Sequence, residues 1–479
     1  MLFYTPEFLV FSLLLLAMLG IVHKSEPRKL ILLIASYVFY MWWNPAFILL
    51  IIISTVIDYV IGGKMADEEN QNKRRLLLIA SMTSNLGMLF FFKYAGLFGD
   101  SLLGIMRMMG SEPSWVSLNI TLPVGISFYT FQTMSYTIDI YRRELKATHK
   151  PLDFALFVAF FPQLVAGPIV RAATFLPQLT KDVKIACDQT TLFLILRGMA
   201  KKVLIADNLA IFIDPVFNSP EGWPSIIIWL AAIGFAIQIY CDFSGYSDIA
   251  IGIARILGFT LPRNFNHPYS ARNPSDFWNR WHISLSSWLR DYLYISLGGN
   301  RGSAFATYRN LMLTMLLGGL WHGASWNFLV WGLLHGSLLV GHRLYTGTRR
   351  KMDPNWRAGD GWVTYLLSLF VMQYFVLLTW ISFRLTDFDA MQTAIYKFVV
   401  FDFNFELASI GLGNMAFFST LGLMLTFSVF TIISQRVGHI ENYLGTLSTA
   451  KAAGVCFISG IVFYYFWPLT QAPFIYFQF

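Results

Sequence analysis

The stretch LMLTMLLGGLWHGASWNFLVWGLLHG, residues 311–336, decides the class of fold, because it is apolar enough for lipid and yet carries His322 and His335. The eleven residues from Leu311 to Trp321 form, as a helix, a run of about 16 Å, half of a ~30 Å hydrocarbon core. If this helix starts near one membrane face, His322 lies near the bilayer midplane, where an ionisable side chain is costly and predicts a functional site. The alternative, a neutral histidine hydrogen-bonded between packed helices, stays open here. His335 lies in a smoother helical pattern, and we expect it to be structural.

The composition as a whole predicts a membrane protein. Of 479 residues, 56% are hydrophobic and only 13% are charged, which is about half the charged fraction of a soluble protein. Many separate apolar runs approach the ~20 residues that a helix needs to cross a bilayer. We therefore predict an all-α polytopic membrane protein. The net charge of +8 lies in short loops between these runs, where it sets orientation, so it does not indicate nucleic-acid binding.

Metal and disulfide chemistry have little support in the sequence. Cys187, Cys241 and Cys456 lie far apart and form no CxxC pair, which predicts neither a metal cluster nor a disulfide framework. HExxH and GxSxG motifs are absent from the sequence, and two histidines without nearby carboxylates or cysteines make a weak ligand set. We predict no metal site.

Alternation of apolar runs and basic loops predicts about twelve crossings, with the basic loops in the cytoplasm and both ends of the chain outside. The first run lacks the basic start and cleavage site of a signal peptide and is predicted to be a span. The predicted spans are 2–22, 30–43, 46–62, 76–92, 119–141, 203–217, 224–258, 311–321 with 326–345, 362–383, 416–434 and 451–470. The whole chain is predicted to be one membrane domain, in which 1–150, 151–345 and 346–479 are the N-terminal helices, the catalytic core and the C-terminal helices.

Several segments depart from simple spans. Pro162, Gly167 and Pro168 interrupt the apolar run 154–169, so we predict a re-entrant or irregular segment there. Gly318, Gly319 and Gly323 flank His322 and permit tight packing or a broken helix. We also expect the span 224–258 to be broken by the polar run from Asp242 to Asp248, and expect external segments at 94–118 and 384–414, the second an amphipathic surface segment.

The most polar part of the chain is 259–303, where Pro274 marks a helix start. Five apolar side chains then recur at spacings of 3, 4, 3 and 4, which predicts one amphipathic helix at the cytoplasmic interface, aromatic face toward the acyl chains: Trp278, Trp281, Leu285, Trp288 and Tyr292. This interpretation leaves His282 unexplained, together with a cationic rim suited to a phosphate-bearing molecule: Arg272, Arg280, Arg290 and Arg301. The glycine-rich run 298–302 lacks a P-loop lysine and is predicted to be a turn.

Five long motifs run through the first three quarters of the chain: LPVGISFYTFQTMSYTIDIYR (122–142), FFPQLVAGPIVR (160–171), IYCDFSGYSDIAIG (239–252), NPSDFWNRWHISLSSWLRDYLYISLGGNR (273–301) and LLGGLWHGASWNFLVWGLLHG (316–336). They resemble the membrane-bound O-acyltransferase (MBOAT) family, and within it the bacterial branch that acetylates alginate. The resemblance extends to about residue 345. It implies a ring of about 11–12 transmembrane helices around a thinned centre, in the inner membrane of a bacterium.

The resemblance also implies an activity. Members of this branch pass acetyl groups from a cytoplasmic thioester through a tunnel to periplasmic acetyltransferases, which modify an exported polysaccharide such as alginate. The implied donor is acetyl-CoA or an acylated carrier protein, with no bound cofactor, and the implied partners are those periplasmic enzymes and membrane lipid. The family's intramembrane histidine matches His322, in W-H-G, and a second histidine of the bacterial branch matches His282, in R-W-H-I-S-L-S.

Neutral imidazole, with a reference pKa of about 6.5, suits removal of a hydroxyl proton near neutral pH. We therefore predict that His322 is the general base, or a transient acyl carrier, and that His282 orients the donor or polarises its carbonyl. Candidate tunnel residues are Asp242, Ser244, Tyr246, Asp248, Trp281, Trp321, Trp326 and Asn327. Candidate ligands of donor phosphates, which are otherwise positive-inside surface charges, are Arg280, Arg290 and Arg301.

Two alternatives to acetyl transfer remain at this level. A transporter or flippase would also have broken helices and polar groups at the midplane, although transporters often show internal repeats and none is evident here. D-alanyl transfer to teichoic acid is the runner-up within the enzyme class. Alginate, cellulose and peptidoglycan acceptors are not distinguished by the sequence, and neither is the identity of the donor.

Overall fold

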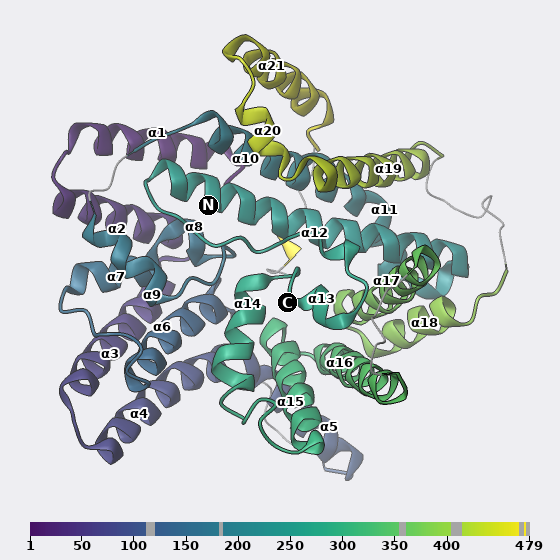
Figure 1. Cartoon of the computed structure of the whole chain (residues 1–479), viewed down its shortest axis with the longest axis horizontal. Helices are drawn as coiled ribbons and strands as arrows, with labels where there is room; N and C mark the ends of the chain where they lie inside the picture. The colour runs from purple at the N-terminus through teal and green to yellow at the C-terminus, as the bar shows by residue number, and fades with distance from the viewer. Residues whose placement is uncertain (112–119, 182–184, 354–360, 404–413, 469–473, 476–479) are drawn as a thin grey trace. The chain divides into compact units, whose positions relative to one another are not determined.

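The computed structural model describes residues 1–111, 120–181, 185–353, 361–403, 414–468 and 474–475 (Figure 1). The described residues are largely helical, and none of them lies in a β-strand. This confirms the all-α polytopic class. The chain forms two compact units, the first from Met1–Cys187 with Ile249–Pro262, and the second from Asp188–Asp248 with Arg263–Phe479. Each unit is described by itself below.

The first unit is built from helices of very different lengths. In chain order they are α1 (Pro6–Ile21), α2 (Ser25–Met41), the 3-10 turn η1 (Pro45–Phe47), α3 (Ile48–Asp67), α4 (Gln71–Leu89), the π-helical η2 (Phe90–Tyr94), α5 (Ala95–Met108), α6 (Ile126–Tyr141), α7 (Pro151–Ala159), α8 (Phe161–Leu164), α9 (Ala172–Phe175) and the 3-10 turn η3 (Leu176–Thr180). The helices α3, α4 and α6 pack against one another. The turn between α3 and α4 is capped by Asn70, whose side chain accepts hydrogen bonds from the backbone N–H groups of Asn72 and Lys73.

Two predictions about irregular segments in this unit have different outcomes. The run 154–169 is irregular as predicted, because α7 ends at Ala159 and only the single turn of α8 follows before Val165. Ala95–Met108 continues the α4 and η2 helix without a break, and the external position predicted for 94–118 stays a prediction. Mostly apolar side chains follow Lys93 and no proline lies before Gly110, so the backbone hydrogen bonds continue. Residues 112–118 of that prediction lie outside the described residues.

The second unit contains both long helices and short helical turns. They are α10 (Gln189–Met199), the π-helical η4 (Ala200–Ala206), α11 (Asp207–Asn218), η5 (Pro220–Gly222), α12 (Ser225–Ile256, whose last residues belong to the first unit), η6 (Pro268–Ser270), α13 (Pro274–Trp278), α14 (Ile283–Trp288), the π-helical η7 (Leu289–Tyr294), α15 (Ala304–His322), α16 (Trp326–Met352), α17 (Trp362–Arg384), α18 (Phe388–Val399), α19 (Asn414–Val437), α20 (Ile440–Gly445) and α21 (Thr449–Phe466).

The predicted break in the span 224–258 is wrong, because α12 runs without interruption from Ser225 to Ile256. The polar run inside it is tolerated because both carboxylates, Asp242 and Asp248, pair with cations of the neighbouring elements. Gly245 lets the chain at Gly198 approach closely, since a Cβ there would lie 2.7 Å from the Gly198 carbonyl oxygen. Because cations of the neighbouring elements neutralise the two carboxylates, the backbone hydrogen bonds of α12 continue through the polar run.

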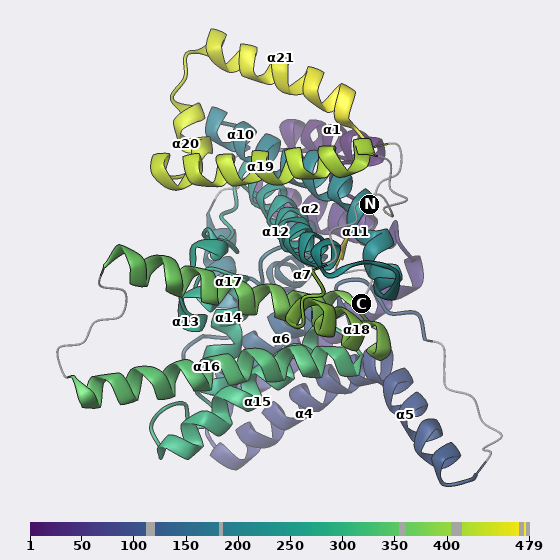
Figure 2. The same ribbon diagram turned by 90° about the vertical axis from the view of Figure 1, so that its right-hand side faces the viewer.

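Helices α15 and α16 form a tight hairpin around His322, and they lie side by side in Figures 1 and 2. The helix break predicted near Gly323 is confirmed, since α15 ends at His322 and α16 begins at Trp326. The new helix is capped by Ser325, whose hydroxyl accepts from the backbone N–H of Asn327. A Cβ on Gly319 would collide with the carbonyl oxygen of Phe328 in α16. Close contact of the two backbones thus depends on glycine, as is typical of packed membrane helices.

Six helices of the described chain are long and apolar enough to cross a membrane: Pro45–Asp67, Gln71–Met108, Ser225–Ile256, Trp362–Arg384, Phe417–Val437 and Thr449–Phe466. Helix α1, predicted as the first span, is apolar but has only 16 residues. The predicted total of about twelve crossings and the ring around a thinned centre stay predictions. The amphipathic segment predicted at 384–414 is confirmed for α18, which buries Met391, Ala394 and Phe398. Residues 404–413 lie outside the described residues.

Candidate functional site

His322 is the last residue of α15, and its side chain is 5% exposed. Its imidazole is surrounded by aromatic rings from three elements. The ring centroids lie 5.0 Å from Trp321, 4.9 Å from Trp331 in α16 and 5.1 Å from Phe383 in α17, all in edge-to-face contact. Such contacts fix the orientation of a flat ring in a largely apolar setting. His322 is therefore held rigidly where a helix ends and the backbone turns.

His282 occupies a turn that the sequence analysis missed. The predicted single amphipathic helix is wrong here, because α13 ends at Trp278 and α14 begins only at Ile283. His282 itself has φ of +40°, a left-handed conformation that is uncommon outside glycine. Asn264 stabilises the turn, because its carbonyl oxygen accepts from the Ile283 N–H at 2.9 Å and its side-chain oxygen accepts from the Ser284 hydroxyl at 2.6 Å. A long-range contact thus overrides the helical spacing.

The aromatic face of this segment also points elsewhere than predicted. Instead of facing acyl chains, Trp281 is 1% exposed, and Trp288 and Tyr292 are also buried. The Trp281 indole is stacked on Phe277 with ring centroids 5.8 Å apart and lies 4.7 Å from Trp380 of α17. Burial inside the protein explains the same periodicity without a membrane surface.

Because the helix breaks at His282, the imidazole of this residue lies beside the indole of Trp321, which also contacts His322. The centroid of the His282 ring lies 5.9 Å from that of Trp321 and 4.6 Å from that of Phe243 in α12. Burial lowers the pKa of His282 to about 3, so the ring is neutral across the physiological pH range. Two residues forty positions apart, His282 and His322, therefore share Trp321 as a common neighbour.

His335, in α16, is also surrounded by aromatic rings, and it shares one of them with His322. Its imidazole is fully buried and contacts Trp331 at 4.6 Å and Trp278 at 5.1 Å between ring centroids. Trp331 also contacts His322, so a single indole separates the two histidines. Its structural role, expected from the sequence, stays a prediction.

The two carboxylates predicted to line the tunnel take part in ion pairs. Asp242 lies 2.7 Å from the ammonium of Lys202, which also lies 2.8 Å from Asp207. Asp248 pairs with Arg197 and with Lys201, at 2.7 Å each. Both lie in α12, and their cationic partners lie in α10 and η4. The pairs compensate the desolvation of these charges, and each carboxylate is positioned by its cation.

The C-terminal residues Phe474 and Ile475 reach the same region, which sequence reasoning missed. The backbone N–H of Ile475 donates to Asp242 Oδ2 at 2.7 Å, and Phe474 contacts Tyr246 with ring centroids 5.0 Å apart. Phe474 also lies 6.1 Å from Phe243, the ring that contacts His282. Both residues are almost fully buried. The only signal in the sequence is an apolar end too short to cross a membrane.

The remaining predicted tunnel residues are more scattered. Ser244 and Tyr246 are buried on α12, next to Asp242 in the sequence. Asn327 is buried at the start of α16, where its amide donates to the backbone carbonyl oxygens of Leu385 and Asp387. Trp326 is 55% exposed and does not share their buried setting. Most of the predicted tunnel residues are therefore buried, whereas Trp326 is exposed.

The arginines predicted to bind phosphate differ in their surroundings. Arg280 pairs with Asp276 at 2.7 Å, and Arg290 pairs with Asp291 at the same distance. Each of these charges is already partly neutralised by a carboxylate. Arg301 is exposed in the turn before α15, where Gly298 and Gly299 have positive φ, which confirms the turn predicted at 298–302.

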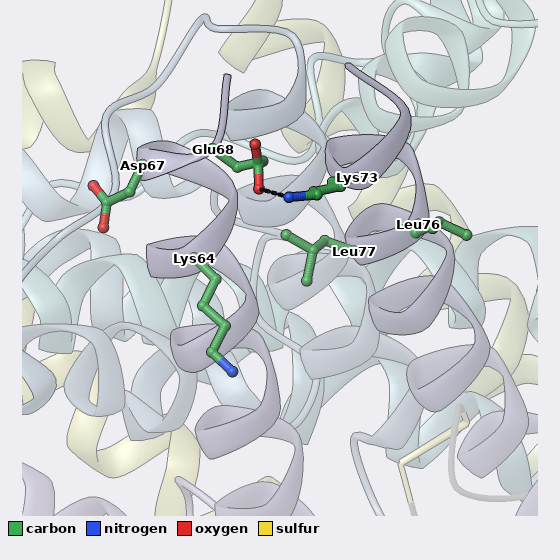
Figure 3. Close-up of a pocket in the computed structure, with 6 residues that line it drawn as sticks. All are labelled: Lys64, Asp67, Glu68, Lys73, Leu76 and Leu77. Atoms are coloured by element: carbon green, nitrogen blue, oxygen red, sulfur yellow. Dashed lines mark ion pairs between the residues drawn. The ribbon is translucent and has the colours of Figure 1, made fainter. Parts of the chain in front are cut away.

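A surface pocket of about 530 Å³ lies at the turn between α3 and α4 in the first unit (Figure 3). Its lining residues are Lys64, Asp67, Glu68, Lys73, Leu76 and Leu77, and it contains none of the predicted site residues. Lys73 and Glu68 form an ion pair of 3.6 Å across it. Within the described parts of the chain, no group of three or more His, Cys, Asp or Glu side chains is placed to hold a metal ion.

Comparison of the sequence with known proteins identifies its family. Residues 43–386 match the family model of the membrane-bound O-acyltransferases. The chain is 41% identical over 432 residues to the probable alginate O-acetylase AlgI of Pseudomonas aeruginosa, an alignment that covers 87% of this chain and 79% of that relative. It is 40% identical over 452 residues to the corresponding protein of Azotobacter vinelandii, covering 93% and 87% of the two chains.

A relative with a different printed substrate is also similar. The peptidoglycan O-acetyltransferase of Helicobacter pylori is 38% identical over 340 residues, which cover 65% of this chain and 62% of that protein. The family match spans the two histidines, the aromatic rings between them and the paired carboxylates of α12. The chain therefore belongs to the membrane-bound O-acyltransferase family.

Proposed function

We propose that this membrane acyltransferase takes an acetyl group from a cytoplasmic thioester and passes it through the bilayer to a periplasmic acceptor, for O-acetylation of an exported polysaccharide such as alginate. Family membership makes the chain an enzyme and removes the transporter alternative. Two relatives that are each 40% identical or more carry the name alginate O-acetylase, which supports acetyl as the group transferred. The relative that acts on peptidoglycan keeps a second acceptor open.

The observation that carries the proposal is the shared contact of His282 and His322 with Trp321. One imidazole ends α15 inside the protein and the other occupies a left-handed turn held by Asn264. Both are buried, so neither serves as a solvated surface histidine. A buried pair of imidazoles around one indole is well suited to acid–base chemistry in an apolar site.

In the proposed reaction, an unprotonated nitrogen of His322 accepts the proton of the acceptor hydroxyl as its oxygen attacks the thioester carbonyl. The new carbon–oxygen bond forms and the carbon–sulfur bond breaks. The imidazolium then returns the proton to the departing thiolate, so the products are an acetate ester and a free thiol. Edge-to-face rings around His322 exclude water, which limits hydrolysis of the thioester.

His282 takes the second role in this proposal. Because its ring is neutral, one of its nitrogens is an N–H donor and the other an acceptor. A neutral donor polarises a thioester carbonyl without placing a buried charge beside it. Asp242 and Asp248 support the wall of the site through α12 rather than through proton transfer, since each is committed to an ion pair.

The experiment is a transfer assay with the full chain in proteoliposomes. Acetyl-CoA, an acetylated carrier protein and a D-alanylated carrier protein are supplied on one side, and a soluble periplasmic acetyltransferase with an alginate oligosaccharide on the other. We expect loss of an acetyl thioester to match ester formed on the far side. Thioester loss with D-alanine alone would instead assign the chain to D-alanyl transfer, and ester formation with a peptidoglycan acceptor alone would change the acceptor.

A further inference from the structure

Asp58 is a carboxyl group in the middle of a membrane-crossing helix and belongs to the first unit. It lies 10 residues after Ile48 and 9 residues before Asp67, the two ends of α3. At 1.5 Å per residue, it is roughly 14 Å from either end of the helix. Its side chain is fully buried, and α3 is one of the six helices able to span a membrane. An ionisable group at that depth indicates a function until shown otherwise.

Polar side chains from three helices surround this carboxyl. On one side, the Nδ2 of Asn85 in α4 donates to Asp58 Oδ2 at 2.7 Å. Asn85 Oδ1 in turn accepts from the hydroxyls of Ser54 at 3.0 Å and Thr133 at 3.1 Å, which fixes the orientation of the amide. On the other side, Ser81 Oγ lies 2.6 Å from Asp58 Oδ1. All five side chains are completely buried.

Asp58 has no cation among the described residues, unlike Asp153, Asp242 and Asp248, which are also buried. Asp153 pairs with Lys29, while Asp242 and Asp248 pair with lysines or arginine. Within the part of the chain that the structure describes, no lysine, arginine or histidine nitrogen lies within ion-pair distance of Asp58. An ionised carboxylate buried without a counter-charge costs several kcal/mol, by order of magnitude, more than neutral hydrogen bonds return. Neutralisation by a bound positive ion removes that cost.

A count of the hydrogens available for the contacts around Asp58 indicates which positive ion it binds. Thr137 Oγ1 lies 3.2 Å from the backbone oxygen of Met134, Ser81 Oγ lies 3.0 Å from Thr137 Oγ1, and Asp58 Oδ1 lies 2.6 Å from Ser81 Oγ. Ser81 and Thr137 have one hydroxyl hydrogen each for these three contacts, and the Met134 carbonyl has none. With an ionised Asp58, Ser81 donates to Asp58, Thr137 donates to Ser81, and the contact with Met134 is left without a hydrogen. All three contacts are hydrogen bonds at once only if Asp58 supplies the third hydrogen.

We propose that Asp58 is a proton-binding site: its carboxyl holds a proton at neutral pH and donates it to Ser81, at the head of a chain that runs through Thr137 to the Met134 carbonyl. The site joins α3, α4 and α6 without a buried charge. It shares no residue with the histidine pair of the second unit. The ligand is a proton rather than a sodium ion, because a cation among these oxygens would need them as ligands at ~2.4 Å instead of as hydrogen-bond partners.

Infrared difference spectroscopy tests this directly, because a protonated carboxyl has a carbonyl stretch that an ionised carboxylate lacks. The full chain is compared with Asp58→Asn in lipid bilayers at pH 7, in sodium chloride and in potassium chloride. We expect the wild-type chain to show one such band that Asp58→Asn removes, with equal intensity in both salts. Absence of that band, or its loss in sodium alone, would overturn the proposal.

Two further variants make the result specific. Ser81→Ala removes the acceptor of the proton, so the band should move to higher frequency, and an unchanged frequency would contradict the assignment. Asp67→Asn changes an exposed carboxylate of the same helix and should leave the band untouched. Asparagine closely matches the shape of a neutral carboxyl, so Asp58→Asn should keep its melting temperature. If it fails to fold, the frequency shift in Ser81→Ala still decides the question.

Discussion

The imidazole of His282 lies 5.9 Å from the indole of Trp321, with the two ring planes inclined at 55°. That indole also contacts His322, whose ring centroid is 5.0 Å away in edge-to-face contact. One tryptophan thus connects a histidine in a short polar segment with a histidine at the end of an apolar helix. The arrangement depends on tight packing of α15 and on the turn at His282, and both are open to test.

The glycine contact between α15 and α16 gives a stability prediction. Gly319→Ala should destabilise the chain by about 1–3 kcal/mol, because its Cβ meets the backbone oxygen of Phe328, which cannot move without distorting α16. The measurement is the melting temperature in detergent. Gly341→Ala on α16 is the control, since nothing lies within 4 Å of a Cβ there, and it should be neutral or slightly stabilising. Equal effects of both changes would show that the close contact is unimportant.

The buried ion pairs beside the site give a second prediction. Lys202→Met leaves Asp207 and Asp242 without their cation and should cost about 3–5 kcal/mol of unfolding free energy. The double variant Lys202→Met/Asp242→Asn removes one of the two stranded charges and should recover part of the loss. Denaturant or thermal unfolding measures both. Lys64→Met, at an exposed position, is the control, and a double variant no more stable than the single one would contradict the pairing.

Burial of His282 makes stability depend on pH. Its pKa is about 3 in the folded chain and about 6.5 when unfolded, so between these values only the unfolded chain holds the proton. Unfolding free energy therefore falls as the pH falls below about 6.5, by about 1.4 kcal/mol per pH unit. Between pH 7 and pH 5 this amounts to about 2 kcal/mol.

The variant His282→Asn tests this dependence of stability on pH. Asparagine tolerates the left-handed conformation of residue 282 and does not titrate. The melting temperature of His282→Asn should fall less between pH 7 and pH 5 than that of the wild-type chain. Parallel curves for the two proteins would mean that His282 is protonated equally in the folded and unfolded states.

The hydrogen bond from the C-terminal segment gives a fourth prediction. Ile475→Pro removes the N–H that donates to Asp242 and should cost about 1–3 kcal/mol. Transfer should also slow, because Phe474 packs near Phe243, which contacts His282. Ile475→Val keeps the N–H and most of the side chain and is the matched control. If proline and valine give the same rate and melting temperature, the hydrogen bond does not support the site.

Local patterns in the sequence predicted the elements whose signals are local. The break after His322 follows from Gly323 and the Ser325 cap, and the turn at 298–302 follows from its glycines. The apolar runs predicted the class of fold for the same reason, since hydropathy is a property of a single segment. The motifs identified the family, which the comparisons confirm.

Contacts between distant segments account for what the sequence analysis missed. The turn at His282 depends on Asn264, eighteen residues earlier, so helical spacing through that position was misleading. Helix α12 stays unbroken because Arg197, Lys201 and Lys202 neutralise its carboxylates, and no pattern within α12 reveals those partners. The approach of Ile475 to Asp242 joins residues 233 positions apart. Such pairings follow from the packed fold and from no single segment.

The central claim is that His322 removes a proton during acyl transfer, and the rate of acetyl transfer by His322→Gln tests it most directly. Glutamine keeps a polar side chain but has no basic nitrogen, so the rate should fall by about 10²–10⁴-fold with unchanged melting temperature. His342→Gln, at a half-buried position of α16, is the control for the loss of a histidine elsewhere in the chain. A His322→Gln rate equal to that of the wild-type chain would contradict the account.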